Sequence, residues 1–181
     1  MKINRLLTAT GVLLMAFSCG NPNLDAEKPF SITYNILNRD GTKTNTVKQG
    51  ENFIFSLIIT NNSDEEWYVD HGSLLGSDLA MLYSKSSVGN DTLIGRAYDS
   101  AICSFQAGVV IPANGHLEIN IPWIADQLLT KFPSCGLNAN VNRMLPAGWY
   151  AIKLDGKIII FRSDITYEIP LRAYNSSFQV K

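Results

Sequence analysis

The sequence predicts an all-β protein, an antiparallel β-sandwich with a short helical insertion. Apolar residues recur with a period of two over residues 53–60, which is the pattern of a strand. The Pro-Ala-Asn-Gly stretch at 112–115 is a turn sequence, and alternation resumes beyond it over 117–121. Many short alternating segments separated by such turns are typical of antiparallel sandwiches.

The strand at 53–60 is expected to be central, because apolar residues occupy both of its faces. The polar stretch 61–66 that follows is expected to be a hairpin turn. Turn signals such as Asp40-Gly41 and Gly89-Asn90 separate the other segments. The remaining strands are expected at 30–37, 67–69, 79–84, 100–105 and 174–180.

Two further elements are expected in the second half of the chain. Asp155-Gly156 is a favoured two-residue turn, so residues 148–162 are predicted to form a hairpin across it. The only predicted helix covers about 124–131, where three aliphatic residues would share one face. This helix is the expected insertion in the sandwich.

The N-terminus has the pattern of a secretory signal. Lys2 and Arg5 precede an apolar run that ends at residue 17, and the run is shorter than the about 20 apolar residues of a membrane span. The end of the run resembles a bacterial lipobox, in which Cys19 is acylated. Ala16 stands where leucine is usual, and Ala16 with Ser18 also fits ordinary signal-peptidase cleavage. The alternative is therefore a secreted protein with a free N-terminal thiol.

These features divide the chain into three parts. Residues 1–18 are the predicted lipoprotein signal peptide, residues 19–29 a polar tether, and residues 30–181 one sandwich domain. We expect the N-terminal lipid to attach the protein to the outer membrane of the cell envelope, facing either the periplasm or the outside. Stable attachment takes two or more acyl chains.

The net charge indicates which partners to expect, and the cysteine count indicates whether a disulfide is expected. Removal of residues 1–18 takes away two of the 15 basic residues and leaves 13 against 16 acids, a net charge of −3. This balance offers no basic patch for nucleic acid. If Cys19 is acylated, Cys103 and Cys135 remain as an even pair, which predicts a disulfide in an oxidising compartment. Two reduced core thiols are the alternative.

Three stretches carry a family resemblance: GENFIFSLIITNNSDEEWYV, IPANGHLEINIPW and LPAGWYAIKL. Their order resembles that of the landmarks in the BsuPI family of proteinase inhibitors, and the same plan resembles uncharacterised lipoproteins of Bacteroides-type bacteria. The resemblance covers about residues 48–155 and implies an immunoglobulin-like sandwich. The matching residues build turns and core: Gly50, Asn61, Pro112, Gly115, Trp123, Gly148 and Tyr150. The signal peptide, the two body cysteines and an insertion at 125–145 depart from the family, so an exported inhibitor would need a different target.

No group of residues in the sequence predicts a reaction. Asp70 and His71 are adjacent, so on a strand their side chains would face opposite ways, and His116 alternates outward with Glu118. Metal sites need three or four convergent ligands. We therefore expect no catalytic residues, no metal and no cofactor. A hydrolase is a third and weaker class, for which the sequence contains no nucleophile elbow.

Loops on a rigid β scaffold are the expected site of function. The leading prediction is a monomeric, non-catalytic module that binds an unknown protein or glycan. The alternative is an envelope proteinase inhibitor whose loop at 137–148 presents Arg143 or Met144 to a protease pocket. Trp67 and Trp149 complete the candidate binding residues, because exposed aromatic rings bind ligands well.

Overall fold

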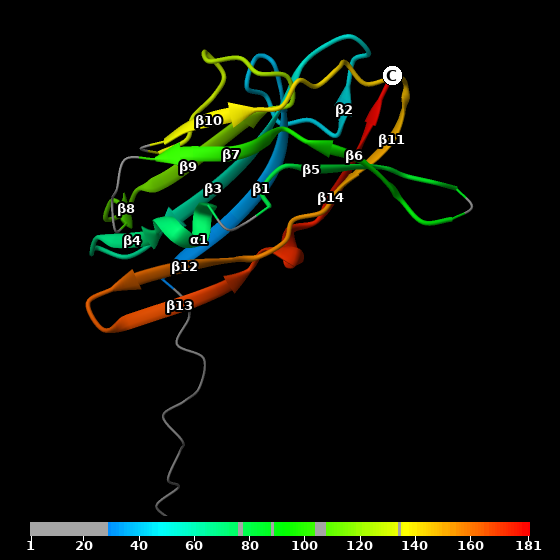
Figure 1. Ribbon diagram of the computed structural model, residues 1–181. Helices are drawn as coiled ribbons and strands as arrows, with labels where there is room; N and C mark the ends of the chain where they lie inside the picture. The colour runs from blue at the N-terminus through cyan, green and yellow to red at the C-terminus, as the bar shows by residue number, and fades with distance from the viewer. Residues whose placement is uncertain (1–28, 76–77, 88, 104–107, 134) are drawn as a thin grey trace, which may run out of the picture.

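A computed structural model describes residues 29–75, 78–87, 89–103, 108–133 and 135–181. The predicted signal peptide, Cys19 and all of the tether except Pro29 lie outside these residues. The described chain is an immunoglobulin-like β-sandwich with one short α-helix and one short 3-10 helix (Figure 1). The fold class predicted from the sequence is confirmed.

One layer of the sandwich is an antiparallel sheet of three strands in the order β1-β3-β9. Its members are β1 (Phe30–Asn38), β3 (Phe53–Asn61) and β9 (His116–Pro122). The expected central place of residues 53–60 is confirmed, since β3 pairs with β1 on one side and with β9 on the other. The core-facing residues of β3 are at most 1% exposed, and on its other face Ile54 is 3% exposed.

Two further sheets cover the inner face of this layer. One has the order β13-β12-β4-β8 and the other the order β2-β14-β11-β5-β6. The strands of the first are β4 (Trp67–Asp70), β8 (Gly108–Ile111), β12 (Lys157–Arg162) and β13 (Ile165–Pro170). Those of the second are β2 (Thr46–Val47), β5 (Met81–Ser84), β6 (Thr92–Arg96), β11 (Gly148–Ile152) and β14 (Ser176–Val180).

Aromatic contacts join the layers across the core. The ring of Phe30 on β1 lies 5.1 Å from that of Tyr167 on β13, and Phe53 on β3 lies 4.9 Å from Phe178 on β14. Edge-to-face and tilted pairs of this kind add to the free energy gained from burial. A separate two-stranded ribbon, β7 (Tyr98–Cys103) with β10 (Cys135–Ala139), extends beside the sandwich (Figure 1).

The predicted hairpin across Asp155-Gly156 is wrong. β11 pairs with β14 and β5, whereas β12 pairs with β13 and β4, so the two strands belong to different sheets. Gly156 has a φ of 96° and lets the chain turn from one sheet into the other. The observed hairpin lies between β12 and β13, across Ser163 and Asp164. Turn residues specify a local bend, and they leave open which strands pair beyond it.

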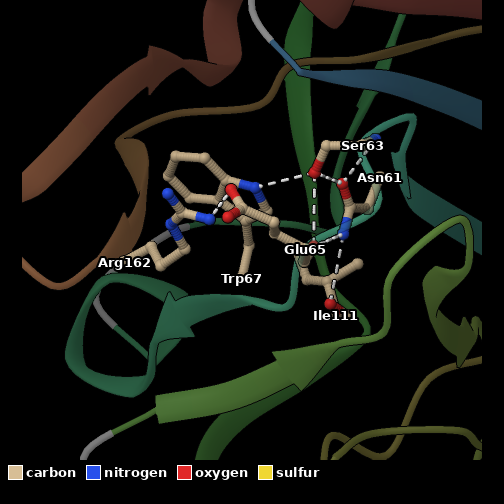
Figure 2. Close-up of polar contacts among 6 residues, drawn as sticks. All are labelled: Asn61, Ser63, Glu65, Trp67, Ile111 and Arg162. Atoms are coloured by element: carbon tan, nitrogen blue, oxygen red, sulfur yellow. Dashed lines mark hydrogen bonds and ion pairs between the residues drawn. The ribbon is translucent and has the colours of Figure 1, made fainter.

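The stretch 61–66 is also a crossover between sheets and not a hairpin, because β3 and β4 lie in opposite layers. The turn at Pro112–Gly115 is confirmed by a bond of 3.0 Å from the Gly115 amide to the Pro112 carbonyl, and it joins β8 to β9 across the same two layers. Asn61 holds these crossovers together. Its side-chain amide donates to the carbonyl of Glu65 at 2.7 Å, as Figure 2 shows, and to the carbonyl of Pro112 at 2.9 Å. This asparagine is 1% exposed.

The helix predicted at 124–131 is wrong, and the segment is a series of turns in which Leu128 is 94% exposed. The amide of Leu128 donates to the carboxylate of Asp126 at 3.0 Å, which is local side-chain bonding that competes with a helix. The α-helix of the described chain is α1 (His71–Leu75). The carboxylate of Asp70 accepts from the Ser73 amide at 2.6 Å and so caps the N-terminus of α1.

Candidate binding surface

Residues 140–145, here called the ledge, follow β10 and form neither helix nor strand. Val141 is fully exposed, at 101% of its reference area, and Met144 is 45% exposed. Arg143 between them is exposed as well. A bond of 3.0 Å from the Asn142 amide to the Asn140 carbonyl closes a γ-turn, with Val141 at its centre. The ledge thus presents three side chains of mixed chemistry to solvent.

The backbone of the ledge is held from behind by buried groups. The indole N–H of Trp123 donates to the Arg143 carbonyl at 2.8 Å, and Trp123 is itself 2% exposed. The side-chain amide of Asn142 donates to the carbonyls of Arg96 at 2.8 Å and Trp123 at 3.0 Å. Leu145 ends the ledge in the core at 7% exposure. Side chains are therefore exposed on a backbone that is tied to the core.

Trp123 is itself fixed by aromatic packing in the core. Its ring stacks on Phe53 of the central strand at 6.1 Å and 11° and meets the edge of Phe55 at 6.4 Å. The same sandwich end is closed by Tyr150, whose hydroxyl donates to the Pro146 carbonyl at 2.8 Å. Both residues belong to the landmark set of the sequence, and both act here by holding the segment between β10 and β11.

An apolar groove of about 540 Å³ adjoins the N-terminal end of the ledge. Ala139, directly before the ledge, is part of its lining. The larger apolar side chains of the lining are Tyr98, Ile121, Pro122, Phe132 and Leu137. One wall is the 124–132 segment, which pairs with β9 through two backbone bonds between Asn120 and Lys131 of 2.8 and 2.9 Å. The groove and the ledge form one continuous candidate surface.

Tyr98 forms a boundary between this groove and a smaller, polar hollow of about 230 Å³. The hollow is lined by Asp78 and Asp99 and by Arg96, which is paired with Asp78 at 3.1 Å. Burial raises the pKa of Tyr98 to about 12, and the charge of Asp78 adds to the shift. Burial also raises the pKa of Tyr34 well above its ordinary value, with a contribution from Tyr98. Both phenols are neutral hydrogen-bonding groups at physiological pH.

The sequence-predicted site residues fall in different places. Arg143 and Met144 are together on the ledge, and Trp149 is exposed on the outer face of β11 at 54%. Trp67 is only 4% exposed, and its indole donates to the hydroxyl of Ser63 at 3.1 Å. Figure 2 shows the guanidinium of Arg162 beside its ring, at 5.3 Å from the ring centre. Trp67 is therefore a core residue without an open stacking face.

The cysteines are only partly covered by the structure. Cys103 and Cys135 are register partners in the backbone pairing of β7 with β10. Cys19 lies outside the described residues. The two histidines lie on different elements: His71 is buried at the start of α1, and His116 is exposed at the start of β9. Within the described ranges, no group of three His, Cys, Asp or Glu side chains is placed to hold a metal ion.

The loop predicted at 137–148 is shorter in the structure, because residues 137–139 belong to β10 and Gly148 begins β11. Sequence reasoning also missed the groups that support it. The groove lining comes from β7, β9 and β10, which meet only in the folded chain. The alternation Asn140-Val141-Asn142-Arg143 was the available signal, since two asparagines flanking an aliphatic residue in a loop indicate side-chain bonds to the backbone. In the described part of the chain, no helix is long and apolar enough to cross a membrane.

Comparison with known proteins adds little. No family model matches the chain, and no curated protein matches it. The fold is similar to a beta-glucosidase from Listeria innocua in complex with gluconolactone, at 11% identity and a TM-score of 0.28, over 83% of this chain and 16% of that one. It is also similar to an ASH/PapD-like domain of human CEP192, at 15% identity and a TM-score of 0.32, over 98% and 94% of the two chains. At these TM-scores neither likeness bears on function.

Proposed function

We propose that this protein is a non-catalytic binding module that holds a polypeptide partner on the ledge and in the adjoining groove. The observation that carries this proposal is the contrast within the ledge: Val141 is fully exposed, while the carbonyl two residues on is held by the buried Trp123. A backbone already fixed in one conformation loses less entropy when a partner binds, so more of the contact energy appears as affinity.

The chemistry of the surface favours a polypeptide over a glycan at this place. The exposed side chains are aliphatic or flexible, Val141 and Met144, and the groove beside them is lined by apolar and aromatic residues. Methionine surfaces adapt to partner side chains of varied shape. A sugar would instead need an open aromatic ring with hydrogen-bonding groups around it, and the ledge carries no aromatic residue.

For the inhibitor alternative, one hydrogen bond bears on which residue could be the primary contact with the protease. A substrate-like inhibitor must place the carbonyl of its primary contact residue in the oxyanion hole of the protease. The Arg143 carbonyl instead points to the body of the domain, where it accepts from Trp123 at 2.8 Å. Arg143 would have to leave this bond before it could act in that way. The alternative therefore centres on Met144.

We further propose that the module is a lipoprotein of the cell envelope, held through acylated Cys19. The support is the charged start, the short apolar run and the polar stretch that precedes the first strand. Replacing Cys19 with Ser should move the protein from the membrane fraction of the cell to the soluble fraction. A Cys19→Ser protein that still sediments with membranes would contradict the anchor and leave the binding proposal intact.

A displayed library of random peptides tests the binding proposal. Peptides selected on the purified domain are titrated by fluorescence anisotropy against the wild type and against Val141→Asp and Met144→Asp. A buried carboxylate without a partner is costly, so each change should weaken binding by at least about tenfold, or about 1.4 kcal/mol. Ile165→Asp is the control matched to Met144→Asp, because Ile165 is 41% exposed, close to the 45% of Met144, but lies on β13. Equal loss in the control and the ledge variants would refute the proposal.

A further inference from the structure

The outer face of the five-stranded sheet carries a second set of side chains with binding chemistry. The register of the sheet sets Thr46 opposite Gln179 and Gln179 opposite Trp149. The Lys85 amide donates to the Trp149 carbonyl at 2.9 Å and continues this row beyond β5. Directly opposite residues point to the same face of a sheet, and the neighbours of Trp149 in β11 and β14, Tyr150 and Phe178, point into the core.

Trp149 is the open aromatic ring of this face. It is 54% exposed, whereas the two other tryptophans, Trp67 and Trp123, are 4% and 2% exposed. The other ring of the face, Tyr83, is covered by the ammonium of Lys153 at 4.5 Å, and Lys153 is held in turn by Asp91 at 2.8 Å. An incoming flat ligand therefore finds one free ring and not two.

The surroundings of Trp149 are polar. A hollow of about 290 Å³ next to the ring is lined by Lys85, Ser86 and Ser87. An apolar protein side chain seated there would displace water from the Lys85 ammonium and the Ser87 hydroxyl without replacing its hydrogen bonds, which is costly. A sugar ring has an apolar C–H face that can stack on the indole. The hydroxyl groups at its rim can form hydrogen bonds with the ammonium of Lys85, the side-chain amide of Gln179 and the hydroxyl of Thr46. The hollow is at the small end of ligand-site volumes, which suits one or two sugar rings.

We propose that the row Thr46, Gln179, Trp149 and Lys85 is a glycan-binding site, in which a pyranose ring stacks on Trp149 and its hydroxyl groups bond to the polar neighbours. This site does not depend on the proposed peptide binding, because none of the four residues lines the groove or belongs to the ledge. The outer face of the sheet would recognise the sugar, and the ledge would recognise the polypeptide.

An array of immobilised plant, bacterial and animal oligosaccharides, probed with the labelled domain, tests the site. Each retained oligosaccharide is then titrated while the quenching of tryptophan fluorescence by acrylamide is followed. With the other two tryptophans buried, quenching reports mainly on Trp149, so a stacked sugar should reduce it. Trp149→Ala should abolish binding, and Trp149→Phe should retain part of it because a smaller ring remains.

Lys85→Ala and Gln179→Ala should each weaken binding of the same oligosaccharide by about threefold to tenfold, because each removes one hydrogen bond. Leu93→Ala is the matched control, since Leu93 is 52% exposed and pairs with Tyr83 on the same sheet. An array without a retained oligosaccharide would overturn the proposal, and so would binding that survives Trp149→Ala. Peptide titration of the same variants distinguishes the two sites: a failed sugar site leaves peptide binding unchanged.

Discussion

The indole N–H of Trp123 donates to the carbonyl of Arg143 at 2.8 Å, across 20 positions of the sequence. This bond links the central core, through the stacking of Trp123 on Phe53, to the segment that presents the fully exposed Val141. The residue that holds the ledge is therefore not itself available to a partner. It acts by fixing the backbone from which Val141 and Met144 project.

Trp123→Phe should release the ledge. Phenylalanine keeps an aromatic ring in the core but removes the donor and some volume, so the free energy of unfolding should fall by about 1–3 kcal/mol. Hydrogen exchange should speed up at the Asn142 amide, which closes the γ-turn. Trp149→Phe is the control, and its surface position should limit the change to about 0.5 kcal/mol. Unchanged exchange in Trp123→Phe would show that the bond does not hold the ledge.

Asn61→Ala should destabilise the end of the sandwich where two crossovers meet. Its side-chain amide donates hydrogen bonds to the carbonyls of Glu65 and Pro112, and both carbonyls would lose a buried donor. We expect the free energy of unfolding in urea to fall by about 2–4 kcal/mol. The adjacent Asn62 is exposed and makes a matched control, so Asn62→Ala should be close to neutral. Similar values for the two variants would contradict the role given to Asn61.

Cys103 and Cys135 should form a disulfide in the exported protein. Residues directly opposite in an antiparallel pair have Cα atoms about 4.5–5.5 Å apart, within the about 4.4–6.8 Å range of disulfides. The bridge would close a loop of about 30 residues and add about 3–4 kcal/mol in the chain-entropy model. Intact mass before and after reduction decides the matter. Two alkylatable thiols in the unreduced protein from the envelope would refute the bridge.

Alkaline pH should destabilise the wall of the groove through Tyr98. Its folded pKa is raised from 10.0 to about 12, so its contribution to stability is complete below pH 10 and is lost as the pH rises toward 12. The free energy of unfolding of the wild type should therefore fall over this interval. Tyr98→Phe should show a shallower fall, because a group with a raised pKa has been removed. Parallel curves for the two proteins would be inconsistent with the burial of this phenol.

The sequence predicted strands better than it predicted their partners. Alternation in 53–60 located a central strand, because a strand buried on both faces must carry apolar residues on both. Asp155-Gly156 located a bend correctly, but the two strands beside it lie in different sheets. Sheet membership depends on contacts between segments far apart in the chain, and a local pattern does not contain that information.

The candidate site also has one part that the sequence could predict and another that it could not. The loop that contains Arg143 and Met144 could be recognised from its own residues, since it lacks periodicity and carries asparagine and proline. The groove could not, because Tyr98, Phe132 and Leu137 come from three separate segments. Trp67 and Trp149 are the same residue type, and the packing of Phe30, Tyr167 and Arg162 around Trp67 is what makes it a core ring while Trp149 stays exposed.

The most direct test of the account is calorimetric titration of a selected peptide into the triple variant Val141→Ser, Arg143→Ser, Met144→Ser. These side chains are exposed, and the variant keeps Asn142, Trp123 and the Arg143 carbonyl, so the melting temperature should move by no more than a few degrees. The account predicts that peptide binding falls by at least about a hundredfold, or about 2.7 kcal/mol, in this folded protein. Wild-type affinity in the folded variant would contradict the ledge as the binding surface.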